Sequence, residues 1–151
     1  MMKLTTLVMM MVCANLASAK SSPSIEVVQS VPVETNLEVP GIRHTQAVWL
    51  EMINSAKTSI DLEQFYISDK AGEQLEPVLK AIEQAAVVRG VRVRLIADKK
   101  FYANYPESVN AIGKLPKAEM RILDYSVFGG VQHAKFFMVD GKQSFLGSAN
   151  F

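Results

Sequence analysis

The chain has 151 residues, of which 49% are hydrophobic and 21% are charged, and its formal net charge is +1. This length suits one domain, and the composition is typical of a globular chain and excludes a disordered one. The nearly neutral charge gives no electrostatic case for a nucleic-acid or membrane-surface partner, although a local basic groove is compatible with it.

Residues 1–19 have the layout of a secretory signal peptide. Lys3 gives a positive start, residues 4–16 are mostly apolar, and residues 17–19 (Ala-Ser-Ala) form a small-x-small cleavage site. The apolar run is too short to span a bilayer comfortably, so we expect cleavage and not an uncleaved anchor. Cys13, the only cysteine, has no small residue directly before it, which disfavours a lipoprotein anchor. We therefore expect a secreted or periplasmic mature protein without cysteine.

Residues 20–44 are predicted to form an extended leader. Pro23, Pro32 and Pro40 interrupt this stretch, and proline breaks helices. Within the leader, residues 25–28 suit an edge strand.

From residue 45 onward, helical and strand-like patterns alternate. Apolar residues at three- and four-residue spacing predict helices, whereas short runs of β-branched and aromatic residues predict strands. The expected helices cover 45–57, 73–89 and, more weakly, 105–115, and the expected strands cover 59–67, 91–98 and 119–124, with a hairpin over 133–150. Helices between strands imply parallel pairing with right-handed crossovers. The predicted fold class is therefore α/β, with a mixed, mostly parallel sheet flanked by helices.

Residues 133–151 (HAKFFMVDGKQSFLGSANF) contain the candidate site. In a strand, residues two apart point to the same side, so His133 and Lys135 share a face. On this basis we expect the alternate residues of the strand to pack under the helices, namely Ala134, Phe136 and Met138.

The pair Asp140-Gly141 predicts the hairpin turn, since glycine accepts a positive φ without steric cost. If these two residues form the turn, His133 lies opposite Ser148. If the turn is one residue later, His133 lies opposite Asn150. Opposed residues have Cβ atoms about 5 Å apart, so either register gathers the polar groups into one cluster.

Such a cluster suits a phosphodiester. Lys135 can neutralise a non-bridging oxygen, and Ser148 and Asn150 can donate hydrogen bonds. His133 can attack phosphorus without a metal, and Gly147 leaves room for a ligand to approach the backbone. No residues have the spacing of a metal-ligand set, so we expect neither a metal nor another cofactor.

Six residues match the signature of the phospholipase D superfamily, the HKD motif, at every position: His133, Lys135, Asp140, Gly147, Ser148 and Asn150. Residues 45–151 also resemble the first half of the endolysosomal phospholipase D-like proteins and their poxvirus relatives.

The resemblance implies a role for each motif residue. In that family two such motifs face each other, one histidine forms a phospho-histidine intermediate, and the other protonates the leaving group. The resemblance implies that His133 is one of these two catalytic histidines, that Lys135 and Asn150 bind the phosphate, and that Ser148 supports it. We expect Asp140 to fix the hairpin and not to be catalytic.

The chain departs from the family because it carries one motif and stops at Phe151. We therefore expect residues 45–151 to be the first half of a phospholipase D-like domain, truncated at its C-terminus, and to be inactive alone. The second motif would come from a missing C-terminal half, with a second subunit as the alternative.

The predicted function is that of an exported phosphodiesterase. Phospholipid head-group hydrolysis is our first choice, and a nuclease acting on single-stranded nucleic acid is the alternative; no amphipathic membrane helix and no ladder of stacking aromatic residues stands out. A non-catalytic binding member and a cardiolipin synthase-like transferase are further alternatives. A second His-x-Lys downstream would favour an enzyme, whereas a transferase would be expected to carry membrane segments.

Four polar residues outside the motif receive structural predictions. His44 is expected at a helix entry and not as a ligand. Glu63 is expected to pair with an arginine, and Arg92 and Arg94 are expected on a solvated strand edge.

Overall fold

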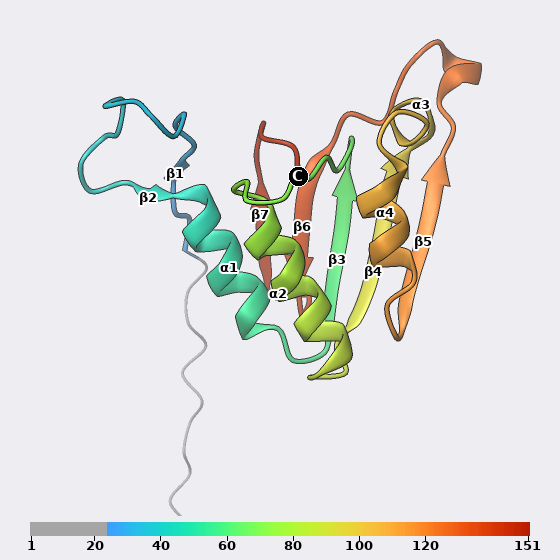
Figure 1. The fold of residues 1–151 in the computed structure, drawn as a ribbon, viewed down its shortest axis with the longest axis horizontal. Coiled ribbons are helices and arrows are strands. Elements are labelled where there is room, and N and C mark those ends of the chain that lie inside the picture. The colour runs from blue at the N-terminus through green and yellow to red at the C-terminus, as the bar shows by residue number, and fades with distance from the viewer. Residues whose placement is uncertain (1–23) are drawn as a thin grey trace, which may run out of the picture.

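A mixed sheet forms the centre of the computed structural model, which describes residues 24–151 (Figure 1). Its five strands lie in the order β5-β4-β3-β6-β7. They are β3 (Ser59–Gln64), β4 (Arg92–Asp98), β5 (Ala118–Leu123), β6 (Lys135–Val139) and β7 (Gln143–Leu146). Strands β3, β4 and β5 pair in parallel, whereas β6 and β7 join by antiparallel pairing. The predicted mixed α/β class is confirmed.

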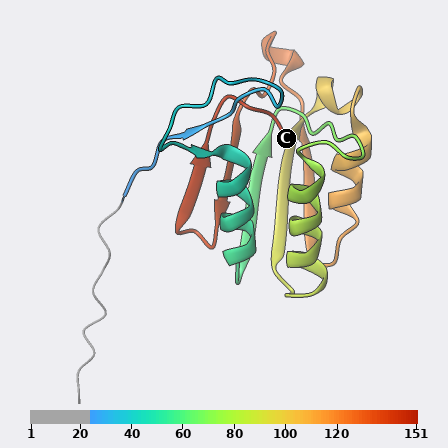
Figure 2. The same cartoon turned by 60° about the vertical axis from the view of Figure 1, so that its left-hand side comes forward.

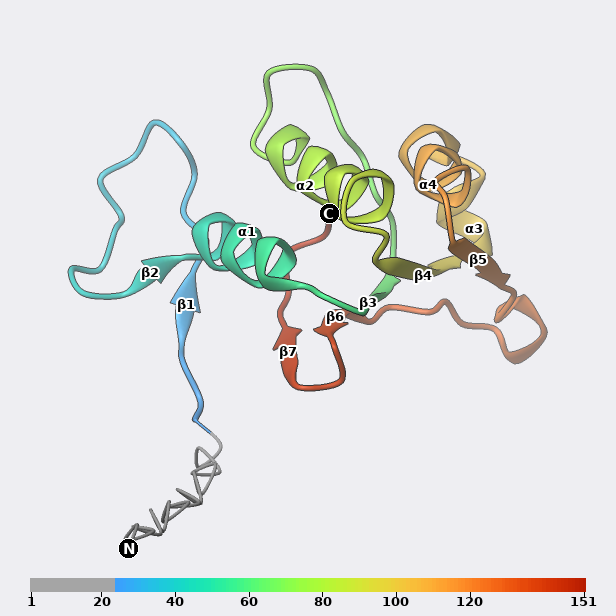
Figure 3. The ribbon, with the colours of Figure 1, turned by 90° about the horizontal axis from the view of Figure 1, so that it is seen from below.

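Helices cover one face of this sheet, as Figures 2 and 3 show. The helices are α1 (Thr45–Ser55), α2 (Glu76–Val87), the short α3 (Lys99–Tyr102) and α4 (Pro106–Gly113), and one 3-10 turn covers Ser126–Phe128. The three long helices lie within the predicted ranges and are shorter than predicted at their ends. α3 was not predicted, because four residues are too short to show a helical period.

The core lies between the sheet and the helices. Fully buried side chains of α1, α2 and the central strands include Ile53, Ile60, Ile82, Leu95 and Phe137. Alternation along β3 and β4 places one set of side chains against the helices and the other set on the helix-free face.

The predicted facing of β6 is wrong. Phe137 and Val139 lie buried under the helices on the side of Lys135, whereas Phe136 and Met138 lie half-buried on the helix-free face. The strand is apolar at every position after Lys135, so the sequence pattern does not indicate which side chains face the helices. Contacts decide it, because the Phe137 ring packs edge-on against Trp49 of α1 at 6.5 Å.

The leader, residues 24–44, is folded against α1. Its strand β1 (Val28–Gln29) pairs in parallel with β2 (Arg43–His44). The side-chain amide of Gln29 donates to the carbonyl oxygens of Val39 and Ile42, at 3.1 and 2.7 Å. Residues 1–19, the predicted signal peptide, lie outside the described residues.

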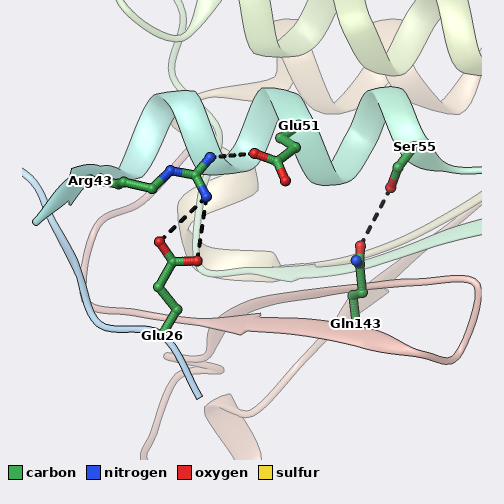
Figure 4. Close-up of polar contacts among 5 residues, drawn as sticks. All are labelled: Glu26, Arg43, Glu51, Ser55 and Gln143. Atoms are coloured by element: carbon green, nitrogen blue, oxygen red, sulfur yellow. Dashed lines mark hydrogen bonds and ion pairs between the residues drawn. The ribbon is translucent and has the colours of Figure 1, made fainter. Parts of the chain in front are cut away.

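Arg43 ties the leader to α1. Its guanidinium pairs with Glu26 at 3.4 Å and with Glu51 of α1 (Figure 4). On the same side of the molecule, the Ser55 hydroxyl at the end of α1 lies 3.4 Å from the Gln143 side chain of β7 (Figure 4). Polar contacts therefore connect α1 to both the leader and the last strand of the sheet.

Candidate active site

The candidate site lies where three neighbouring strands meet at one edge of the sheet. β3 and β4 run in parallel, so both end at this edge, and the antiparallel β6 begins there (Figure 1). Lys135 is the first residue of β6, and His133 lies two residues before it. Phe65 directly follows β3, and Asp98 is the last residue of β4. Residues far apart in sequence are thereby brought together at one edge.

His133 and Lys135 are in direct contact. The Lys135 Nζ lies 3.3 Å from Nδ1 and 3.2 Å from Nε2 of the His133 ring, and it donates to the His133 carbonyl oxygen at 2.9 Å. An ammonium can only donate, so a ring nitrogen that accepts from Lys135 is the unprotonated one.

Lys135 is a cation in a buried position. Its side chain is 6% exposed, and burial lowers its pKa below the ordinary value of 10.5. Among residues 24–151 it forms no ion pair with an acid. A buried ammonium without a carboxylate favours an anionic ligand, because that ligand supplies the missing counter-charge.

The Phe65 ring contacts the side chains of both His133 and Lys135. The His133 ring lies edge-on to the Phe65 ring at 4.4 Å, and the Lys135 Nζ lies 4.8 Å from its centroid. The cation therefore gains a cation–π contact, and the imidazole is held against a buried ring.

The backbone before His133 is fixed by residues that the sequence analysis did not select. The Asp98 carboxylate accepts from Phe101 N at 3.1 Å, which caps α3, and from Gln132 N at 2.8 Å. The Gln132 amide donates to Glu63 at 2.7 Å. Glu63 thus pairs with a glutamine, and the predicted arginine partner is wrong. Asp98 carried a detectable signal, since an acidic residue after a buried strand is a common helix cap.

The hairpin turn uses Asp140 and Gly141, whose φ angles are 54° and 65°. Lys142 N donates to Val139 O at 2.9 Å, which closes a turn with both central residues at positive φ. Val139 nevertheless pairs with Gln143, so the connection has three residues. Both predicted registers are therefore wrong by one residue, and β6 and β7 are offset accordingly.

The Asp140 carboxylate holds this turn against the segment between α1 and β3. It accepts hydrogen bonds from the backbone N–H groups of Lys57, Thr58 and Ser59 at 2.7–3.0 Å, and from the Thr58 hydroxyl at 2.8 Å. The backbone donors keep the pKa of Asp140 far below its ordinary value. A carboxylate engaged in this way cannot serve as a proton carrier near neutral pH.

The glycine-serine-asparagine part of the motif follows the end of β7. Gly147 N donates to Lys135 O at 3.1 Å, so Ser148 and Asn150 come after the paired strands. Ser148 is exposed, and no side-chain hydrogen bond among residues 24–151 links Ser148 or Asn150 to His133 or Lys135. The Asn150 Oδ1 is buried without a partner in the described chain. The structure therefore brings together two of the predicted site residues directly and leaves two with free polar groups.

Gly147 lies close to the Phe145 side chain. A Cβ atom there would lie 2.8 Å from the Phe145 ring. That ring packs against Trp49 at 5.4 Å and stacks on Phe137 at 5.7 Å.

His44, Arg92 and Arg94 make no hydrogen bond or ion pair with His133 or Lys135 among residues 24–151. His44 directly precedes α1 and contacts Glu38 at 3.1 Å. Arg92 is exposed, and Arg94 forms an ion pair with Asp61 at 2.5 Å.

Neither a metal cluster nor a membrane helix is found in the described part of the chain. Across residues 24–151, no three His, Cys, Asp or Glu side chains are arranged to hold a metal ion. No helix of the same residues has the length and apolar character needed to cross a membrane.

Comparison with known families gives a match over most of the chain. Residues 49–151 match the family model described as "Cardiolipin synthase, PLD-like domain". The chain is 31% identical over 138 residues to phospholipase D Z of Dictyostelium discoideum, which covers 84% of this chain and 32% of that protein. It is 30% identical over 106 residues to the virion nicking-joining enzyme of Vaccinia virus, covering 68% of this chain and 24% of the viral protein.

Two further similarities extend the comparison. The chain is 31% identical over 137 residues to the 5′-3′ exonuclease PLD3 of Rattus norvegicus, covering 82% of this chain and 27% of that protein. Among solved structures it resembles Nuc of Salmonella typhimurium, a phospholipase D family member, with a TM-score of 0.59 and 25% identity over 72% of this chain and 65% of Nuc. The chain thus spans about a third or less of the length of these curated relatives.

Proposed function

The chain belongs to the phospholipase D superfamily, and from this membership and the geometry of its site we propose that the protein hydrolyses a phosphodiester through a phospho-histidine intermediate. One observation carries the proposal. The Lys135 ammonium is buried, has no acidic partner among residues 24–151, and lies 3.2–3.3 Å from the ring nitrogens of His133. A cation for the phosphate and a nitrogen for phosphorus are therefore adjacent.

The proposed reaction has two steps. In the first, a histidine nitrogen attacks phosphorus; a P–N bond forms as the P–O bond to the leaving group breaks, and a second histidine gives its proton to the leaving oxygen. In the second, water attacks phosphorus, the P–N bond breaks, and the second histidine takes up the proton of the water. His133 takes one of these two roles. The other histidine belongs to a second copy of the chain or to a part of the protein outside residues 1–151.

The remaining motif residues stabilise charge in this mechanism. Lys135 neutralises a non-bridging oxygen as negative charge develops in the transition state. Ser148 and Asn150 make no side-chain hydrogen bond within residues 24–151, so the Ser148 hydroxyl and the Asn150 amide N–H can donate to the same phosphate. Asp140 holds the hairpin, a role that its four donors support.

Two substrate classes fit this chemistry. Some relatives are named phospholipases D and others a 5′-3′ exonuclease, so both remain candidates. A phospholipid head group was the first choice from the sequence, and the exposed side chains of Val127 and Phe128 beyond β5 would be compatible with a lipid surface. The contact of the His133 ring with Phe65 at 4.4 Å favours single-stranded nucleic acid instead, because bases stack on aromatic side chains.

We also propose that the protein is exported, with residues 1–19 removed as a signal peptide. The support is the order of the positive start, the apolar run and the small-x-small site in the sequence. Sequencing the N-terminus of the secreted protein tests this, and a mature start at residue 20 is expected.

The function is tested on the purified full-length protein with two substrates side by side, phosphatidylcholine vesicles and a 5′-hydroxyl oligonucleotide. We expect turnover of at least one substrate, together with a phosphate bound to the protein through an acid-labile, alkali-stable linkage after rapid quenching. Steady turnover without any protein-bound phosphate would contradict the proposed mechanism. Turnover of the oligonucleotide alone would exclude the phospholipid as substrate.

A further inference from the structure

Five aromatic rings form a continuous row from His133 to Tyr105. The His133 ring contacts Phe65 at 4.4 Å, and Phe65 contacts Phe101 at 3.9 Å. Phe101 stacks on Tyr66 at 5.8 Å with 20° between the planes, and Tyr66 contacts Tyr105 at 5.2 Å. We call these five rings the aromatic row.

The aromatic row was not predicted, because no ladder of stacking aromatic residues stands out in the sequence. Its members come from separate segments: two residues after β3, one in α3, one before α4 and one before β6. Each segment carries only one or two rings, so no local run of aromatic residues appears in the sequence. The fold brings them together at the edge of the sheet where His133 lies.

The outer end of the row opens into a hollow. Phe65 is only 8% exposed, whereas Tyr105 is 39% exposed. A hollow of about 470 Å³ is lined by Tyr66 and Tyr105, and Asn150 of the motif lines it as well. The row therefore joins the buried cation site to an open space that the same motif borders.

We propose that this hollow is a nucleobase subsite in which a base of the substrate stacks on Tyr105 and Tyr66 while its phosphate lies at Lys135. This inference rests on the proposed function and names the substrate class of the same site. A base extends a row of tilted and stacked rings naturally, since every base has a π-face that stacks on aromatic side chains.

The polar lining of the hollow favours a base over a lipid group. Ser68, Lys70 and Gln74 supply donors around the tyrosines, and a base has a polar edge that accepts hydrogen bonds. An acyl chain would need apolar walls. A choline group would meet the like charge of Lys70, although Glu73 lies in the same lining.

Calorimetric binding to the full-length protein tests the subsite. The probes are thymidine 5′-monophosphate and thymidine 3′-monophosphate, each compared with the deoxyribose phosphate that lacks the base. We expect at least one nucleotide to bind about tenfold or more tightly than its abasic counterpart. Tyr105→Ala should remove this difference, and Tyr105→Phe should retain it, because phenylalanine keeps the ring.

The matched control is Tyr125→Ala, because Tyr125 is 38% exposed and is not part of the row. This variant should bind both probes as the parent protein does. Equal affinity for the nucleotides and the abasic phosphates would overturn the inference, as would an unchanged difference in Tyr105→Ala of native fold. Phosphocholine binding that is lost in Tyr105→Ala while the base adds nothing would assign the hollow to a lipid head group instead.

Lys135→Met separates this inference from the proposed function. It should weaken both the nucleotides and the abasic phosphates and leave their ratio unchanged. If Lys135→Met weakens neither probe, the proposed phosphate site fails. If it weakens both and the base contributes nothing in the parent protein, only the nucleobase subsite fails.

Discussion

At the scale of single residues, the hairpin holds two charges in opposite electrostatic situations. The Lys135 ammonium is buried with one carbonyl acceptor and an aromatic ring, so the folded protein disfavours its charge. The Asp140 carboxylate receives four donors, so the folded protein favours its charge. The Lys135 charge thus lowers the stability of the folded protein while no ligand is bound, whereas the Asp140 charge raises it.

Lys135→Met tests the first of these charges. We expect loss of phosphate binding without a fall in the free energy of unfolding, because methionine fills a similar volume and removes a buried charge. The lowered pKa of Lys135 means that the unfolded chain binds more protons just below pH 10.5, so stability should rise with pH in that window. Urea unfolding from pH 8 to 10.5 measures this, and the variant should lack that part of the rise. A variant that is clearly less stable would contradict the assignment.

Asp140→Asn tests the second charge. Asparagine keeps one acceptor and turns a donor toward the backbone N–H groups, so we expect a loss of about 1–2 kcal/mol in stability at pH 7. The lowered pKa of Asp140 makes its contribution present above the ordinary carboxyl pKa of 3.8 and lost as the pH falls below it. The parent protein should therefore lose stability below pH 4 more steeply than the variant. Equal acid dependence of both proteins would contradict this role.

At the scale of elements, the β6–β7 hairpin sets where the motif residues lie. The three-residue connection places Gly147 opposite Lys135 and leaves Ser148 and Asn150 beyond the paired strands. Gly147 then allows the Phe145 ring to pack between Trp49 and Phe137. In this hairpin the motif glycine supports the core directly beside the site.

Gly147→Ala should destabilise the protein by about 1–2 kcal/mol, because a Cβ at 2.8 Å from the Phe145 ring forces that ring from its place. Thermal unfolding measures the effect. The control is Gly130→Ala, since no atom lies within 4 Å of a Cβ built there and its φ is not positive. Equal stability of the two variants would show that Phe145 moves aside freely.

The elements show what could be predicted from the sequence. The fold class could be predicted, because the apolar period of the helices and the strands between them depend on local spacing alone. The facing of β6 and the hairpin register could not be predicted. Val139 and Phe137 alternate with apolar residues, so no period distinguishes the faces, and the extra turn residue follows from contacts between Asp140 and residues 57–59.

The candidate site, like the fold, could be predicted from the sequence only in part. His133 and Lys135 were selected correctly as neighbours, since residues two apart in a strand share a face. The contacts of Gln132 with Asp98 and Glu63 and of Phe65 with His133 were missed, because each joins segments more than 30 residues apart. Long-range pairs of this kind leave no local pattern.

At the scale of the whole molecule, the candidate site contains one histidine within residues 24–151. His44 contacts Glu38 in the leader, so His133 is the one histidine at this edge of the sheet in residues 24–151. The proposed reaction needs two histidines. The geometry therefore favours a catalytic centre shared with a second copy or with another part of the protein.

A purified monomer of residues 20–151 should accordingly show no hydrolysis of bis(p-nitrophenyl) phosphate, whereas the full-length protein or a dimer should show it. Sedimentation velocity on the same samples establishes the oligomeric state. Turnover by residues 20–151 in proportion to the concentration of their monomer would contradict the shared centre. Such a result would require a proton donor within this chain in place of the second histidine.

The most direct test of the account is the turnover of bis(p-nitrophenyl) phosphate by full-length His133→Gln and His44→Gln. Replacing a histidine that attacks phosphorus or protonates the leaving group is expected to lower kcat by roughly 1,000-fold or more. His44→Gln exchanges a residue paired with Glu38 and should retain the parent rate. A His133→Gln protein that keeps its fold and turns over within tenfold of the parent would contradict the central claim.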